Sequence, residues 1–334
     1  MGAMTEAAQV GKRQEILPEV FNAESDATPF FSRLKTGKKP DAMLATWQAE
    51  VYPAVASTGT LDNTPVTTTE SVGRELLSGC NHLFRRPWGV GKLATLGKLA
   101  GVKDEAARQM YISLMLVKRM IEQQALSTDD CAQESGSTPW TMRGAFSWLQ
   151  SSAQTNLPVP AAVRPASATR YTGALASLTE TAFRTMLIAA SNAINQPVNL
   201  EGWCGDDLKA LIDDFTNIYP VASTSSQPRS AYRIEGNSEY KNVVEMLSFS
   251  SGKVAVMPNS FLARTTSTGV VSAYSAKSGV FLNMDMWDIG FMESPANENL
   301  PIDGSGKRGF VDATLVVRCK NPLGQISVLA NRNS

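Results

Sequence analysis

One long stretch of the sequence has apolar residues at the period of an α-helix, and it restricts the folds open to the chain. It runs from Lys103 to Leu126, and its apolar positions recur every three or four residues: Ala107, Met110, Leu114, Val117, Ile121 and Ala125. Acidic residues lie at its start and basic residues towards its end, which matches the helix dipole. At 1.5 Å per residue, the pattern predicts a rod roughly 35 Å long. Such a rod is either an ordinary core helix or a spine between two lobes.

The segments around this helix carry both strand and helix signals. Apolar and polar residues alternate over Thr46–Tyr52, and the Thr-, Pro- and Gly-rich stretch Ser57–Thr69 follows, which predicts a long β-hairpin between Ala45 and Arg74. Two helices are expected at Leu178–Ile194, opened by Thr179, and at Asp206–Phe215, and strands at Lys253–Pro258, Gly279–Met284 and Ala313–Arg318. This order of elements favours an α+β fold over alternating βαβ units.

The N-terminal segment is expected to be a mobile arm. Within Gly11–Pro40 a short helix starts in Leu17–Asn22, and Thr28–Phe31, with its proline, is expected to break it. The adjacent Phe30 and Phe31 need an apolar surface to pack against. That surface is either the core of this chain or a neighbouring subunit.

Composition predicts a folded protein and excludes some partners. Of the 334 residues, 43% are hydrophobic, enough for one large unit or two domains. The 31 Lys and Arg residues balance the 31 Asp and Glu residues, so the basic excess typical of tight DNA binding is lacking. No run reaches the apolar length of a membrane span and the N-terminus lacks a signal-peptide core, so a soluble protein is expected.

Few residues are candidates for chemistry. The single histidine, His82, has no Gly-x-Ser-x-Gly motif beside it, and the four cysteines lie far apart without a Cys-x-x-Cys pair. We expect no catalytic residue, no cofactor and no metal site. Cys80 and His82, which lie close together in the sequence, are not expected to bind a metal either. Cysteines spaced in this way are typical of a reducing cytoplasm, where buried thiols act as small apolar groups.

A glycine-rich segment, Gly89–Ala94, partly matches a nucleotide-binding turn. Leu93 stands where a phosphate loop has Ser or Thr, and the preceding Arg85–Trp88 is not a buried strand. A flexible elbow leading into the long helix is the preferred interpretation. The acidic pairs are expected to be solvated: Asp129-Asp130, Asp206-Asp207 and Asp213-Asp214.

Several segments together resemble the major capsid (head) proteins of tailed double-stranded-DNA phages, which have the Hong Kong phage-type fold. They are Ile16–Phe21 and Thr28–Leu34 in the arm, Thr67–Thr69 at the end of the hairpin, Gly101–Met110, and the closing segments Asp285–Gly290, Ala313–Arg318 and Asn321–Ile326. The resemblance covers most of the chain. It implies an N-terminal arm (1–44), an extended loop (45–85), a peripheral domain (86–177) with a spine helix (103–126), and a mainly axial domain (178–334) from which some strands return to the peripheral domain.

By the same resemblance, the chain is expected to be a structural subunit and not an enzyme. Pentamers and hexamers of it would form an icosahedral head around double-stranded DNA, with non-specific DNA contacts, no membrane, and scaffold, portal and cement proteins as further partners, after a stage in the host cytoplasm. Phe30, Phe31, Trp47 and Tyr52 would contact neighbouring subunits. Some relatives weld subunits through a lysine of the extended loop, but no Lys lies between Asp41 and Gly91, so welding there is not expected.

Two other functions are open at the level of sequence. A nanocompartment shell that holds cargo proteins has the same fold, and the residues do not distinguish it from a phage head. A soluble nucleotide-binding enzyme that uses Gly89–Ala94 is the alternative from another class.

Overall fold

The computed structural model describes residues 28–52, 62, 65, 73–96, 104–215, 245–262, 275–301 and 306–330. The chain divides into two compact units, each described here by itself. Unit 1 contains the described residues 85–96, 104–117, 295–301 and 306–312, and unit 2 contains the others.

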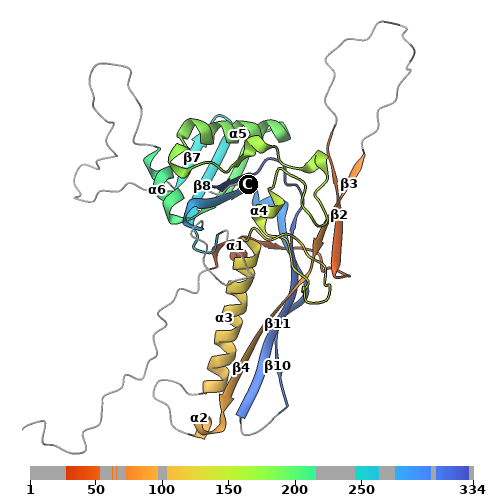
Figure 1. Ribbon diagram of the computed structural model, residues 1–334, viewed down its shortest axis with the longest axis vertical. Helices are drawn as coiled ribbons and strands as arrows, with labels where there is room; N and C mark the ends of the chain where they lie inside the picture. The colour runs from red at the N-terminus through yellow and green to blue at the C-terminus, as the bar shows by residue number, and fades with distance from the viewer. Residues whose placement is uncertain are drawn as a thin grey trace, which may run out of the picture. The chain divides into compact units, whose positions relative to one another are not determined.

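The described residues form helices and strands, many of which are labelled in Figure 1. The helices are α1 (Pro29–Arg33), α2 (Lys92–Leu96), α3 (Glu105–Ala125), α4 (Ala145–Trp148), α5 (Glu180–Ile194) and α6 (Asp206–Asp214). The strands are β1 (Lys35–Thr36), β2 (Leu44–Glu50), β3 (Arg74–Cys80), β4 (His82–Gly91), β5 (Arg170–Tyr171), β6 (Val198–Cys204), β7 (Met246–Phe249), β8 (Gly252–Pro258), β9 (Ser278–Leu282), β10 (Trp287–Asn299), β11 (Gly306–Cys319) and β12 (Ile326–Leu329).

Helix α3 confirms the long helix predicted from the apolar period. Its first half is partly exposed, with Tyr111 at 57%, whereas Val117 and Ile121 in its second half are fully buried. The division between the units falls inside α3, after Val117, and also inside β4, β10 and β11. Within the described part of the chain, no helix is both long and apolar enough to cross a membrane.

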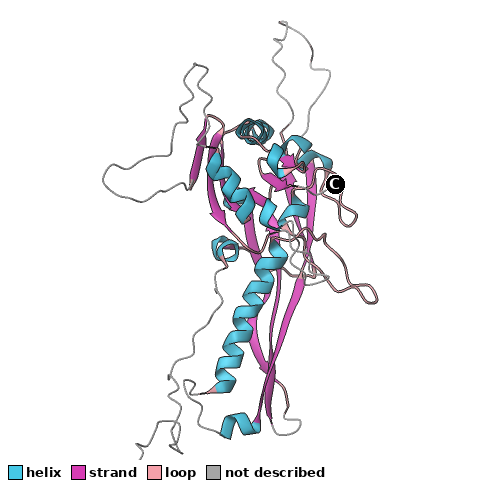
Figure 2. Ribbon diagram, turned by 60° about the vertical axis from the view of Figure 1, so that its left-hand side comes forward, coloured by secondary structure: helices cyan, strands magenta, loops and turns pink. Residues whose placement is uncertain are grey.

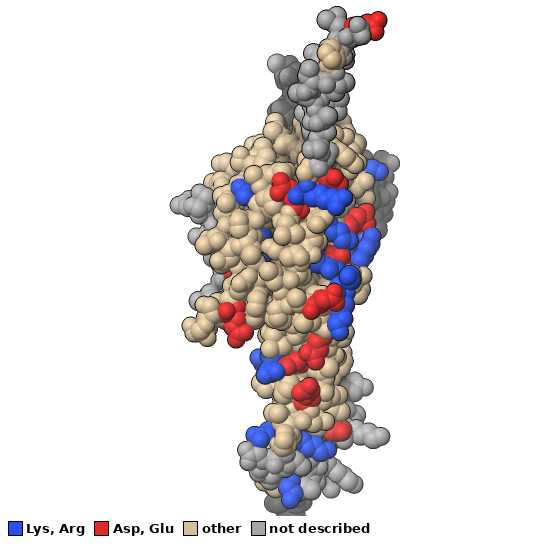
Figure 3. Space-filling view, turned by 90° about the vertical axis from the view of Figure 1, so that its right-hand side faces the viewer, with Lys and Arg blue, Asp and Glu red and all other residues tan. Residues whose placement is uncertain are grey.

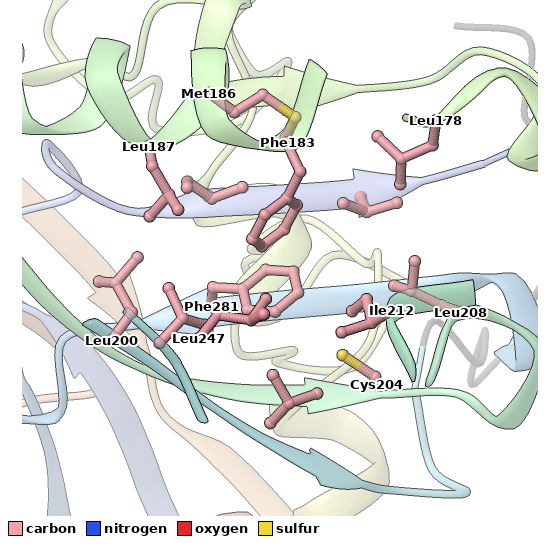
Figure 4. Packing of buried hydrophobic residues seen from close by; sticks show 14 of the residues in the cluster. Leu178, Phe183, Met186, Leu187, Leu200, Cys204, Leu208, Ile212, Leu247 and Phe281 are labelled. Carbon is pink, nitrogen blue, oxygen red and sulfur yellow. The ribbon is translucent and has the colours of Figure 1, made fainter. Parts of the chain in front are cut away.

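The main core of unit 2 lies on a six-stranded sheet with the order β5-β12-β9-β6-β8-β7. Strand β6 pairs in parallel with β8 and antiparallel with β9. Helices α5 and α6 contribute Phe183, Leu187 and Leu208 to the apolar cluster on this sheet, where Phe183 meets Phe281 edge to face (Figure 4). Each such buried side chain stabilises the fold by roughly 1.5–3 kcal/mol.

Helix α5 begins as its sequence predicts. The hydroxyl of Thr179 accepts a hydrogen bond from the backbone N–H of Ala182 at 3.2 Å, so this threonine is the N-cap. Helix α6 and strands β8, β9 and β11 confirm the helix and strands predicted at these places, with ends that differ by a few residues. Strand β11 begins well before its predicted start.

Strands β2 and β3 form a separate two-stranded antiparallel sheet in unit 2. Trp47 pairs with Leu77, and Gln48 with Leu76, so neighbouring residues of each strand face opposite sides. Strand β2 confirms the first strand of the predicted hairpin, whereas β3 begins at Arg74, where the hairpin was predicted to end. Most of the Thr-, Pro- and Gly-rich connection lies outside the described residues.

A four-stranded sheet has the order β1-β10-β11-β4. In unit 1, residues from the start of α3 line a common pocket with residues of β4, β10 and β11, and the helix runs beside these strands (Figure 2). Arg85 of β4 makes a two-pronged ion pair with the carboxylate of Asp312 in β11, with its Nε 2.9 Å from Oδ1, and its guanidinium covers the ring of Phe310. The two strands are thereby tied by their side chains.

Thr28–Phe31 was predicted to break a helix in Leu17–Asn22, and the described residues do not test this. Pro29 occupies the first position of another helix, α1, where its missing N–H costs no hydrogen bond. One local prediction is wrong. Gly89 and Gly91 do not form a flexible elbow, because both belong to β4, and neither has a positive φ. The helix predicted in Leu17–Asn22 lies outside the described residues.

Candidate assembly interface

Phe30 lies in the core of this chain. It is fully buried, and its ring meets the rings of Trp203 and Trp287 edge to face, with centroids 5.1 and 6.2 Å apart. The sequence left open whether Phe30 packs in the core of its own chain or on a neighbouring subunit. The structure places it in the core of its own chain. Phe31, the next residue, is half-buried.

A buried carboxylate fixes the helix that carries these phenylalanines. Glu122 of α3 is 0% exposed and accepts hydrogen bonds from the backbone N–H groups of Phe30 (3.0 Å) and Phe31 (2.7 Å) and from the side-chain amide of Asn259 (2.7 Å). The first N–H groups of a helix lack partners within it, and no side chain of Thr28 caps α1, so Glu122 supplies that cap. Loss of hydration raises the pKa of Glu122 despite these donors.

Trp47 and Tyr52 differ in their surroundings. The indole N–H of Trp47 donates to the carbonyl of Cys319 at 3.0 Å, and its ring lies 5.6 Å from that of Trp148. Tyr52, just beyond β2, is 84% exposed. The four residues singled out from the sequence therefore lie in three different places: the core, the surface of α1 and the hairpin.

The sequence reasoning missed Leu76, a large apolar side chain on the hairpin. It is 58% exposed, whereas its neighbour Leu77 is 1% exposed. Adjacent residues of a strand point to opposite faces, so two consecutive leucines in a half-buried strand require one of them to face outwards. Applied to Arg74–Cys80, this rule predicts from the sequence that one of the two leucines is exposed.

Two cavities open on the described surface. One, of about 500 Å³ in unit 2, is lined by two ion pairs: Arg33 with Glu201, and Lys35 with Asp285 at 2.6 Å. The Lys35 ammonium lowers the pKa of Asp285. The other cavity, of about 390 Å³ in unit 1, has the indole of Trp88 at its wall. Acidic and basic side chains are interspersed on the face shown in Figure 3.

Over residues 3–330 the sequence matches the family model of the SU10 major capsid protein. The chain belongs to this family. It is a structural major capsid protein of the virion, as the resemblance in the sequence implied, and neither the nanocompartment nor the nucleotide-binding enzyme is favoured.

Solved structures confirm the Hong Kong phage-type, α+β fold of this capsid protein. It is similar to the capsids of cyanophage Pam1 (12% identity, TM-score 0.60, 98% of this chain and 97% of that chain) and of cyanophage A-1(L) (13% identity, TM-score 0.59, 98% and 99%). It is also similar to the capsid of the native GTA particle (8% identity, TM-score 0.60, 98% of each chain). No curated protein matches the sequence.

His82, which the sequence analysis considered for chemistry, packs against neighbouring residues of this capsid protein. His82 stacks on Phe84 at 4.2 Å, and its Nδ1 accepts the backbone N–H of Met142 at 3.4 Å. Burial lowers the pKa of His82 to about 4, although the charge of Asp129 opposes the shift. Within the described ranges, no group of His, Cys, Asp and Glu side chains has the arrangement of a metal site.

All four cysteines are buried with free thiols: Cys80, Cys131, Cys204 and Cys319. Burial raises the pKa of Cys204 and of Cys319. The thiols of Cys80 and Cys131 are hydrogen-bonded to each other, which raises the pKa of Cys80. The expected burial of the cysteines is confirmed.

The expectation of solvated acidic pairs is wrong for Asp130. Its carboxylate accepts from the guanidinium of Arg143 at 2.9 Å and from the backbone N–H of Asn156 at 3.1 Å. Asp213 also has a partner, the ammonium of Lys209 at 2.5 Å, one helical turn earlier in α6. The spacing rule that adjacent carboxylates do not face each other is correct, but it does not tell which basic residues approach them from elsewhere.

Proposed function

We propose that this capsid protein forms pentamers and hexamers of itself that close into an icosahedral head around double-stranded DNA. The match to a capsid family over residues 3–330 carries the proposal. Rings of five and six require contacts in which one patch of a subunit meets a different patch of the next copy. Each subunit must therefore display apolar surface that its own core does not cover.

Phe31 and Tyr52 are the proposed contacts with neighbouring subunits among the residues first singled out. Phe31 is half-buried at the surface of α1, and Tyr52 is 84% exposed. We add Leu76, whose side chain is exposed on the outer face of the hairpin. Complete burial of one such side chain contributes roughly 1.5–3 kcal/mol, and a closed shell repeats the contact in every copy.

The proposed domain organisation is an arm (1–44), an extended loop (45–85), a peripheral domain (86–177) and a mainly axial domain (178–334). Strands β2 and β3 support the loop, and α3 supports the spine of the peripheral domain. All strands of the six-stranded sheet except β5 come from residue 198 onwards, which supports the axial domain.

The proposed contacts with DNA are weak and independent of base sequence. The net charge of +0 supports this, because tight binding to phosphates needs a basic excess. Subunit contacts are noncovalent, since Asp41–Gly91 contains no Lys. Scaffold, portal and cement proteins are the further partners proposed, before and during assembly in the host cytoplasm, and the role is structural and not catalytic.

Electron microscopy of negatively stained protein, combined with light scattering, tests the proposed function. Protein expressed alone and protein from a phage lysate are compared at increasing concentration. Uniform shells or rings of subunits are expected. A chain that stays monomeric under every assembly condition contradicts the proposal, and shells that contain a cargo protein in place of DNA indicate a nanocompartment.

A further inference from the structure

The hairpin β2–β3 is closed at its base by hydrogen bonds between its own two arms, and it is held to the rest of unit 2 further along its length. At its base, the side-chain amide of Asn81 donates to the carbonyl of Ala42, and its backbone N–H donates to that of Met43, both at 2.8 Å. Four residues further along β2, the indole of Trp47 donates to the carbonyl of Cys319 at 3.0 Å and packs against Trp148.

The strand next to Trp47 is shaped to admit its indole. Gly79 of β3 pairs with Ala45, and a Cβ at Gly79 would lie 3.2 Å from both the Trp47 ring and the side chain of Val316. Leu77, which pairs with Trp47, is 1% exposed on the same face. The indole therefore sits in a packed contact with the chain's own core.

At Asn81 the chain joins the hairpin to β4, and Trp47 contacts the core further along, so these two points together determine the direction of the hairpin. Met43 and Trp47 are about 13 Å apart along the strand, at roughly 3.3 Å per residue. A rod attached at one point can pivot, whereas a rod attached at two points cannot. Towards the tip, large apolar side chains are exposed: Leu76 of β3 at 58%, and Val51 and Tyr52, just beyond β2, at 37% and 84%.

We propose that Trp47 is a positioning residue for assembly, which holds the hairpin in the direction that brings its outer face to the next subunit. The inference rests on the proposed shell function. It assigns Trp47 a role inside its own chain in place of the intersubunit contact predicted from the sequence. Because every copy uses the same hairpin, an angular error in it is repeated at every contact of the shell.

Hydrogen exchange on unassembled subunits, combined with the yield of closed shells, tests the proposal. Trp47→Phe keeps an aromatic ring and removes the hydrogen bond to Cys319, and Trp47→Leu removes both contacts. Trp140→Leu is the matched control, because Trp140 is also half-buried in unit 2 but lies outside the hairpin. Wild-type protein is assembled in parallel.

In Trp47→Phe, the amides of β2 and β3 are expected to exchange about tenfold faster, the effect of losing one buried hydrogen bond. Trp47→Leu should accelerate exchange further and lower the yield of closed shells at least tenfold. The melting temperature of the subunit should stay within about 4 °C of wild type. Trp140→Leu should give wild-type exchange in the hairpin and wild-type shells.

Two results overturn the inference. Wild-type shell yield from Trp47→Leu shows that the hairpin needs no such anchor. Loss of shells with unchanged exchange in unassembled Trp47→Leu shows that Trp47 contacts the neighbouring subunit directly. Failure of the proposed function is a different observation, because wild-type protein and the Trp140 variant then form no shells either.

Discussion

Arg143 holds three stretches of unit 2 together although only 1% of its side chain is exposed. Its guanidinium donates to Asp130 and to the carbonyls of Asn156 and Leu157, both at 2.7 Å. Leu157 has a φ of +44°, a conformation that costs free energy for a residue with a side chain. Arg143 thus stabilises a turn whose backbone conformation is unfavourable for the leucine at that position.

Replacing Arg143 by methionine should lower the free energy of unfolding by about 3 kcal/mol, because it leaves the Asp130 carboxylate and two carbonyls without their donor. Urea denaturation measures the change. Arg184→Met is the control, because Arg184 is exposed and lies 5.9 Å from the Phe249 ring, and it should cost less than about 0.5 kcal/mol. Equal stability of the two variants contradicts the assigned role.

His82 gives the stability of the subunit a defined pH dependence. Its pKa is about 4 when folded against 6.5 for an ordinary histidine, so between these values the unfolded chain binds more protons than the folded one. The stabilisation is complete above pH 6.5 and is lost as the pH falls towards 4, by about 3 kcal/mol in total.

His82→Asn should flatten the dependence of unfolding free energy on pH across this window. His82 is the only histidine of the chain, so no other imidazole titrates there. Denaturation at a series of pH values from 4 to 7 measures the slope, with wild-type protein as the reference. An unchanged slope means that His82 is not responsible.

At the scale of elements, α1 is too short to be stable alone, and its position depends on Glu122 of α3. Glu122→Gln exchanges one acceptor oxygen for an NH₂ group, so one of the three donors that meet it loses its partner. We expect a loss of about 1–3 kcal/mol and faster exchange of the Phe30 and Phe31 amides, measured by denaturation and hydrogen exchange.

Glu180→Gln is the control for this variant, because Glu180 lies in the first turn of α5 and is not fully buried. It should change the stability by less than about 0.5 kcal/mol. Wild-type protection of the Phe30 and Phe31 amides in Glu122→Gln would show that the carboxylate does not hold α1.

The elements that sequence predicted well are those whose signals are local. The period of α3 and the Thr179 cap of α5 are both set by residues within one or two turns. The start of α1 at Pro29 was missed, because proline breaks a helix from inside but also starts one at its first position. Gly89 and Gly91 were misassigned because glycine permits flexibility without requiring it.

The contacts that hold α1 and the hairpin in place could not be predicted from the sequence. Phe30 and Glu122 are 92 residues apart, and Trp47 and Cys319 are 272 residues apart. No period or motif links such residues, because the contact exists only after the strands and helices between them have packed. The four aromatic residues were therefore recognised as needing a partner surface, but which surface each one meets required the structure.

At the scale of the whole molecule, the outer face of the hairpin should matter for assembly and not for folding. Leu76→Ser removes an exposed apolar side chain, so the melting temperature should hardly change, while the concentration needed to form shells should rise about tenfold. Light scattering and electron microscopy measure this. Leu93→Ser, at a leucine of α2 that is 85% exposed, is the matched control.

Wild-type assembly by Leu76→Ser would remove this residue from the proposed interface. A similar loss in Leu93→Ser would point to a general effect of surface apolarity, and not to a specific contact of the hairpin. The two leucines belong to different units, so the comparison also indicates which unit supplies the contact.

The burial of all four thiols has a consequence for a particle made of many copies. Oxidation by air or peroxide requires a thiol that reaches the solvent, and links between particles require two that meet. In a capsid of this chain, no thiol reaches the solvent and none can meet a thiol of another particle. We therefore expect that transfer from a reducing to an oxidising solution neither oxidises its cysteines nor aggregates the particles through disulfides.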